Sequence, residues 1–123
     1  MNAKKKRMLI VDDQRMVSDA LKMVLTLDGY EVQTAESGRE ALKMFEIGKF
    51  DLIFTDFEMP EMNDHELASI IKAHDARQPI IMVTAYADMV ADLAPVPQVN
   101  LVMGKPSSIG ELRNAISKVL LTI

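Results

Sequence analysis

Short apolar runs alternate with amphipathic stretches five times along this 123-residue chain. Residues 8–11, 52–54 and 80–83 are such runs, each bounded by polar residues, and this pattern predicts strands buried on both faces. The stretches between them carry apolar residues at helical spacing. Strands that alternate with helices through short connections indicate right-handed crossovers and a parallel sheet. The sequence therefore predicts an α/β fold with helices on both faces of the sheet.

The predicted elements can be placed along the chain by their start and stop signals. The expected strands cover residues 7–12, 31–35, 51–56, 80–84 and 99–103. The expected helices cover residues 15–28, 38–48, 64–74 and 86–93, with a last helix from residue 109. Ser37 with Glu40, and Ser108 with Glu111, form the Ser-x-x-Glu pattern of a capping box. For five strands we expect a doubly wound, flavodoxin-like sheet of order 2-1-3-4-5.

Three of the helices have a predicted inward face. The apolar residues expected to pack against the sheet are Val17, Ala20, Leu21, Val24 and Leu25 in the first helix, Leu67, Ile70 and Ile71 in the third, and Ile109, Leu112, Ile116, Val119 and Leu120 in the last.

Size and charge narrow the class of protein. We expect one domain over residues 1–123, with a basic lead-in at residues 1–6 and no output domain in this chain. The net charge of −4 argues against direct nucleic-acid binding, and the absence of cysteine excludes thiolate chemistry. No apolar stretch is long enough to span a bilayer, so we expect a cytoplasmic protein without membrane contact.

Polar residues suited to phosphate chemistry follow the predicted strands. Asp12 and Asp13 end the first strand, Asp56 the third, Thr84 the fourth, and Lys105 follows the fifth. Parallel strands bring their carboxyl ends to one edge of the sheet, where ligands bind in open α/β folds. In the order 2-1-3-4-5 the first and third strands are neighbours at the switch point. Three carboxylates, a hydroxyl and an ammonium group should therefore share one crevice.

Clustered carboxylates repel each other unless a cation lies among them. Oxygen ligands without histidine or cysteine favour Mg²⁺, and Lys105 adds a second positive charge. A carboxylate beside a metal and a lysine is suited to accept a phosphoryl group as an acyl phosphate. Thr84 can donate a hydrogen bond to that group, and Ala85 leaves room for its approach.

Taken in this order, Asp12-Asp13, residues 56–62 (Asp-Phe-Glu-Met-Pro-Glu-Met), Thr84-Ala85 and Lys105-Pro106 resemble the CheY-like response-regulator receiver domain of two-component signalling. The resemblance extends over nearly the whole chain. It implies that Asp56 is the phosphorylated residue. It also implies that Asp13, Asp56 and the backbone carbonyl of Glu58 ligate Mg²⁺, with Asp12 acting mainly through a bound water.

The resemblance further implies that Lys105, Thr84 and the Ala85 backbone N–H sense the phosphoryl group, and that the Lys105–Pro106 bond is cis. The implied phosphodonor is a sensor histidine kinase or a phosphotransfer protein of a phosphorelay. The signal would pass to a downstream protein that the sequence does not identify. The resemblance also allows a homodimer through the face formed by the fourth helix, fifth strand and fifth helix.

The chain departs from the family pattern at three places. Asp64 replaces a usual glycine after the phosphorylation site, which predicts a shifted or strained loop. Val102 stands where the family has an aromatic switch residue. Residues 86–100 contain two prolines, which predicts a shortened or distorted helix. We expect phosphorylation of Asp56 to remain intact and the transmission of the signal to differ.

Three other functions use parts of the same pattern. A Mg²⁺-dependent phosphatase or phosphotransferase would also form an aspartyl phosphate. Such enzymes commonly have a general-acid aspartate two residues after the nucleophile, where this chain has Glu58. A flavodoxin-type binder would need a phosphate cradle in place of the acidic Asp12-Asp13 loop. A receiver-like module could also act by protein contacts without phosphorylation. We expect a phosphoacceptor that is not a conventional enzyme, although it should dephosphorylate itself.

Overall fold

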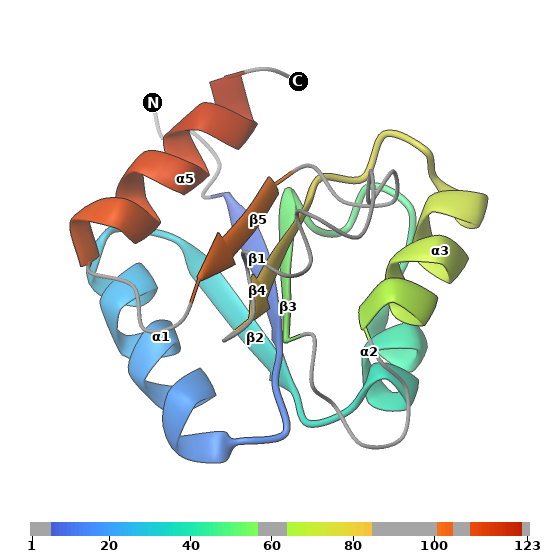
Figure 1. Ribbon diagram of the computed structural model, residues 1–123, viewed down its shortest axis with the longest axis horizontal. Helices are drawn as coiled ribbons and strands as arrows, with labels where there is room; N and C mark the ends of the chain where they lie inside the picture. The colour runs from blue at the N-terminus through green and yellow to red at the C-terminus, as the bar shows by residue number, and fades with distance from the viewer. Residues whose placement is uncertain (1–5, 57–63, 85–100, 105–108, 122–123) are drawn as a thin grey trace.

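Five parallel strands form a single sheet at the centre of the molecule. The computed structural model describes residues 6–56, 64–84, 101–104 and 109–121 (Figure 1). The strands are β1 (Arg7–Val11), β2 (Glu31–Ala35), β3 (Leu52–Asp56), β4 (Ile80–Thr84) and β5 (Leu101–Gly104). All neighbouring strands are parallel and their order is β2-β1-β3-β4-β5. The predicted topology is confirmed.

Helices cover both faces of this sheet, as predicted. The described helices are α1 (Arg15–Leu27), α2 (Gly38–Met44), α3 (Asp64–His74) and α5 (Ile109–Leu121). Figure 1 shows α1 and α5 on one side of the sheet and α2 and α3 on the other. The helix predicted at residues 86–93 lies outside the described residues. No helix in the described part of the chain is long and apolar enough to cross a membrane.

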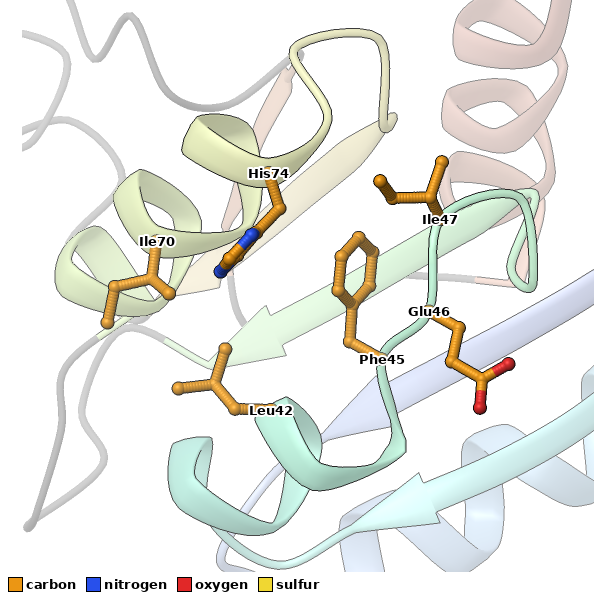
Figure 2. Close-up of a pocket in the computed structure, with 6 residues that line it drawn as sticks. All are labelled: Leu42, Phe45, Glu46, Ile47, Ile70 and His74. Atoms are coloured by element: carbon orange, nitrogen blue, oxygen red, sulfur yellow. The ribbon is translucent and has the colours of Figure 1, made fainter.

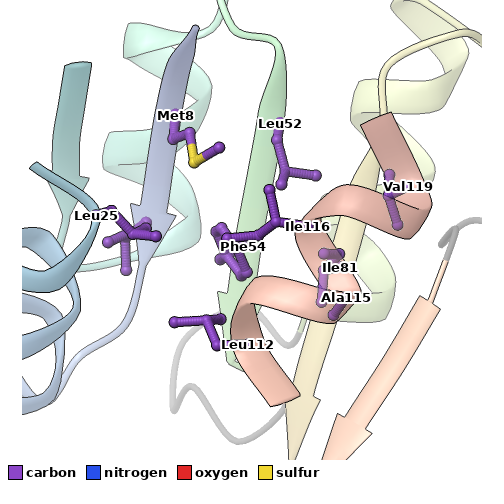
Figure 3. Packing of buried hydrophobic residues seen from close by; sticks show 10 residues of the cluster. Met8, Leu25, Leu52, Phe54, Ile81, Leu112, Ala115, Ile116 and Val119 are labelled. Carbon is purple, nitrogen blue, oxygen red and sulfur yellow. The ribbon is translucent and has the colours of Figure 1, made fainter. Parts of the chain in front are cut away.

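Two apolar clusters hold these layers together, because successive side chains of each strand point to opposite faces of the sheet. Under α1 and α5 the cluster consists of Met8, Ile10, Leu25, Leu52, Phe54, Ile81, Leu112, Ala115, Ile116 and Val119 (Figure 3). Under α2 and α3 it consists of Leu9, Val11, Ala35, Ala41, Phe50, Ile53, Leu67, Ile71 and Ile80. The sheet is therefore anchored from both sides, and its strand ends are held in fixed register.

Local signals set most of the helix boundaries. The Ser37 hydroxyl accepts a hydrogen bond from the Glu40 backbone N–H at 3.1 Å, which confirms the serine half of the first capping box. Gly29 follows α1 with φ +98°, a left-handed conformation that ends the helix at little cost for glycine. The second capping box begins at Ser108, which lies outside the described residues.

The helix predicted to end near Gly48 is shorter than expected. α2 ends at Met44, and Phe45 leaves the helix in an extended conformation (φ −71°, ψ 131°). This conformation lets the half-buried Phe45 side chain pack against the cluster under α2 and α3. Gly48 then adopts φ +79° in the turn that leads to β3. Tertiary packing of one aromatic ring thus overrides the helical pattern of the sequence.

Three residues predicted to face the core are exposed. Ile109 is 49% exposed because it begins α5, one turn before the buried Leu112. Ala20 is exposed in α1, where the buried face is narrower than its apolar pattern indicates. Ile70 of α3 is exposed beside the buried Ile71. These three predictions were wrong, and each concerns the border of a helix face.

A two-point ion pair joins α5 to the end of α1. Arg113 Nε donates to Asp28 Oδ2 at 2.9 Å, and Arg113 Nη2 donates to Asp28 Oδ1 at 2.8 Å. Asp28 is the C-terminal cap of α1, so the pair links the two helices that cover the same face. The hydrogen bond from Arg113 lowers the pKa of the Asp28 carboxyl below 3.8; desolvation opposes this shift, and the positive charge of Arg113 adds to it.

This ion pair makes a small part of the stability pH-dependent. Because folding lowers the pKa of Asp28, the contribution of this carboxylate to the free energy of unfolding is fully present above pH 3.8. It is lost as the pH falls through the lowered pKa. We expect Arg113→Gln to return the pKa of Asp28 toward 3.8, as measured by carbon NMR titration of the carboxyl group. Lys118→Gln in the same helix is the control, and an equal effect of both variants would contradict the pairing.

Candidate phosphoacceptor site

The register of the sheet brings the predicted site residues to one edge. Val11 of β1 lies opposite Thr55 of β3, so the carboxyl ends of these two strands lie side by side. Asp56 of β3 pairs with Val83, one residue before the end of β4. Neighbouring strands are about 4.8 Å apart, so the backbones of Asp12, Asp56 and Thr84 occupy successive positions along this edge. The backbones of Asp12, Asp56 and Thr84 thus lie at one edge, while the predicted crevice that would also include Lys105 stays a prediction.

Asp12 is held rigidly where β1 ends. It is 4% exposed, and its backbone N–H donates to the Ala35 carbonyl at 3.0 Å, which extends the β1–β2 ladder. Its Oδ1 accepts a hydrogen bond from the Gln14 backbone N–H at 2.8 Å. One carboxylate oxygen therefore shapes the turn into α1. A buried carboxylate fixed at a strand end is well suited to orient a cation or a cation-bound water.

Asp13 differs from Asp12 because it is exposed to solvent. It does not cap α1, since the N-terminal cap of that helix is Gln14, which makes no side-chain capping hydrogen bond. Within the first turn of α1, the Ser18 hydroxyl donates a hydrogen bond to the Arg15 carbonyl at 3.1 Å. A capping role for Asp13 is thus excluded by the structure, and its side chain remains accessible to a ligand at the edge.

The other predicted site residues are placed to different degrees. Asp56 and Thr84 are the last residues of β3 and β4, although their side chains are not described. Gly104, which pairs with Thr84, is the residue before Lys105. Glu58, Ala85, Lys105 and Pro106 lie outside the described residues, so the predicted carbonyl ligand, N–H donor, ammonium group and cis bond stay predictions.

Asp64 does not carry the backbone strain that the sequence predicted. It is the first residue of α3, and none of the non-glycine residues in the described part of the chain has a positive φ. The glycine that the family usually has here is therefore not needed for a left-handed conformation in this chain. Val102 lies in the middle of β5, opposite Met82.

The donor atoms at this edge suit a hard divalent cation. Asp12, Asp13 and Asp56 supply only oxygen, and Mg²⁺ is usually held by one or two carboxylates together with water and phosphate oxygens. Among the described side chains, which do not include that of Asp56, no group of three histidine, cysteine, aspartate or glutamate residues could hold a metal ion. The cation site therefore stays a prediction.

Sequence reasoning missed Thr55, which lies between Phe54 and Asp56. Its side chain is buried, and its Oγ1 has no hydrogen-bond partner within the described part of the chain. A cavity of about 20 Å³, bordered by Asp12, Val17 and Thr55, lies beside the site and has room for about one water. The only signal in the sequence was a single polar residue inside an apolar strand.

Comparison with known proteins gives an independent indication of the family of this chain. A model of the response regulator receiver domain matches residues 8–117. The regulatory protein AtoC of Escherichia coli is 37% identical over 68% of this chain, and the transcriptional regulatory protein GlrR of the same species is 34% identical over 98%. The chain spans only 18% of the length of AtoC and 27% of the length of GlrR.

Solved structures show that the similarity extends to the fold. A CheY-like receiver domain from Methanospirillum hungatei is 30% identical and has a TM-score of 0.88, covering 97% of this chain and 96% of that one. The response regulator TrrA of Thermotoga maritima, solved in complex with Mg²⁺ and BeF, is 37% identical with a TM-score of 0.85, covering 94% and 99%. With its sheet order, its acidic strand ends and these similarities, the chain belongs to the family of response regulator receiver domains.

Proposed function

We propose that this domain accepts a phosphoryl group on Asp56 with the help of Mg²⁺ and passes the signal on by a change in protein contacts. The observation that supports this most directly is the sheet register, which aligns Asp12, Asp56 and Thr84 along one edge. A carboxylate oxygen of Asp56 attacks the phosphorus of a phosphohistidine. The phosphorus–nitrogen bond breaks, and its electron pair stays with the imidazole of the donor.

The residues of this chain have separate tasks in that step. Asp13, Asp56 and the Glu58 backbone carbonyl would hold the cation, and Asp12 would act mainly through a bound water. The cation would neutralise the charge of the phosphoryl oxygens. Thr84, the Ala85 backbone N–H and Lys105 hydrogen-bond the phosphoryl group once it is attached. Phosphoryl transfer depends mainly on positioning and charge neutralisation, and the two core clusters hold β1 and β3 in register for this purpose.

The test is the intact mass of the protein after treatment with acetyl phosphate, with and without Mg²⁺. We expect one phosphoryl group per chain, taken up only with Mg²⁺ and mapped to Asp56. Continuous turnover of free phosphate esters would instead favour the phosphatase or phosphotransferase alternative. Failure of uptake under all conditions would favour a module that acts without phosphorylation.

We further propose that α1 is where the phosphodonor docks. Met16 is 87% exposed and Leu27 is 80% exposed, and with Ala20 and Met23 they lie at helical spacing along one side of α1. We call these four residues the α1 stripe. It begins four residues after Asp12 and so leads directly from the acidic edge. An apolar stripe beside the acceptor fits a helix of a histidine kinase or phosphotransfer protein.

A substitution in the α1 stripe should separate docking from chemistry. We expect Met23→Glu to slow phosphorylation by the cognate kinase roughly tenfold or more, because a charge is buried at the helix contact. Uptake from acetyl phosphate should stay unchanged, since Met23 is far along α1 from Asp12. Rates from both donors are compared by mass spectrometry, with Ile109→Glu as the control. Equal slowing with both donors would argue against docking on α1.

A further inference from the structure

A shallow apolar groove lies between the end of α2 and α3. These two helices cover the opposite face of the sheet from α1 (Figure 1). Its volume is about 440 Å³. We call it the α2–α3 groove, and its lining residues are Leu42, Phe45, Glu46, Ile47, Ile70 and His74. It exists because α2 ends at Met44, so that the chain leaves the helix before it can cover this side of α3.

The groove exposes a clustered apolar surface. Ile47 is 69% exposed and Ile70 is 36% exposed, while Leu42 and Phe45 are half-buried at its floor. Figure 2 shows Phe45 and His74 facing the same hollow with Ile47 at its edge, whereas the Glu46 carboxylate points away. Single exposed apolar side chains need no explanation, but a group of four around one hollow marks a contact surface.

We propose that a second copy of this chain docks here, with Ile47 of each copy inserted into the groove of the other. This face supplies both the side chain that would insert and the groove that would receive it. The exposed Ile47 lies at the edge of a hollow large enough for an isoleucine side chain. A two-fold axis next to Ile47 would satisfy both copies at once, and two-fold dimers are the commonest assemblies of identical chains.

Charged residues of both signs lie on this face. Glu46 precedes Ile47 in the loop, and the last turn of α3 carries Lys72 and His74, with Asp75 directly after it. Lys72 Nζ donates to the Ala76 carbonyl of its own copy at 3.5 Å. When Ile47 enters the partner groove, Glu46 of one copy approaches the basic last turn of α3 in the other. Lys49, another charged residue of the loop, has its Nζ 5.4 Å from the ring centre of Phe50 in its own copy. The contact is small, so we expect a weak, reversible dimer.

Sedimentation of the unphosphorylated protein tests this proposal at concentrations up to about 1 mM, the scale of weak complexes. We expect a monomer–dimer equilibrium whose dissociation constant rises roughly thirty-fold or more in Ile47→Glu, because the inserted side chain is the anchor. Ile109→Glu, at another exposed isoleucine, is the control and should dimerise like the original protein. A monomer at all concentrations, or a dimer that Ile47→Glu leaves intact, would overturn the proposal.

Disulfide trapping gives a second, independent test because the chain contains no cysteine. We expect a mixture of Ile47→Cys and His74→Cys proteins to form a mixed disulfide when oxidised. Both positions are exposed, so neither variant should unfold. The matched mixture of Ile109→Cys with His74→Cys should cross-link only slowly. Equal rates in the two mixtures would show that Ile47 does not enter the groove of a second copy.

Discussion

The Asp56→Asn protein should take up no phosphoryl group from acetyl phosphate or from a histidine kinase. An amide oxygen is a far weaker nucleophile than a carboxylate, and the substitution also removes one negative charge from the cation site. The loss should be complete at any practical reaction time. It is measured by intact mass, with Mg²⁺ present throughout.

The same strand offers a matched control for this substitution. Asp51 lies directly before β3, at the opposite edge of the sheet, where its Oδ2 accepts a hydrogen bond from the Arg7 backbone N–H at 2.8 Å. Asp51→Asn changes the same functional group in the same part of the chain, and we expect normal uptake. Uptake that persists in Asp56→Asn and maps to Asp12 or Asp13 would move the acceptor to β1.

The arrangement of this edge could be predicted because it follows from strand order alone. Apolar runs that end in Asp12 and Asp56 belong to neighbouring strands once the order 2-1-3-4-5 is assumed, and the observed register agrees. No side-chain detail is needed for that inference. The structure adds the Gln14–Asp12 hydrogen bond and the exposure of Asp13, which separate two adjacent carboxylates by their environment.

The details that the sequence did not predict depend on contacts between elements. The helical pattern continued through Phe45, but the ring packs better against the core when the chain is extended there. Ile109 satisfied the helical spacing but lies before the turn that reaches the sheet. Thr55 was hidden inside an apolar run. For Phe45, local helix propensity is worth less than the tertiary contact that competes with it.

The two proposed contact surfaces of this chain are separate from each other. The α2–α3 groove and the α1 stripe lie on opposite sides of the sheet, so a phosphodonor and a second copy need not compete. Val102, one of the positions where the chain departs from the family pattern, is not among the residues that define either surface. We infer that docking and self-association can be altered by substitution without changing how the phosphoryl group is sensed.

Phe54→Ala should cause a large loss of stability. Phe54 is 1% exposed in the central strand β3, and its cluster combines side chains from β1, β4, α1 and α5 (Figure 3). Removing a buried phenyl ring loses its transfer free energy and leaves a cavity, which together cost about 3–5 kcal/mol. For a domain of this size the melting temperature should fall by roughly 10–20 °C.

Denaturant unfolding of Phe54→Ala and of the control Ile109→Ala measures how much each substitution lowers the free energy of unfolding. Ile109 is 49% exposed, so its truncation should change the free energy of unfolding by no more than about 0.5 kcal/mol. Because Phe54 lies two residues before Asp56, we also expect slower uptake from acetyl phosphate in Phe54→Ala at temperatures where it is still folded. A loss below about 1 kcal/mol would mean that the core closes around the missing ring, and that the register of β3 does not depend on Phe54.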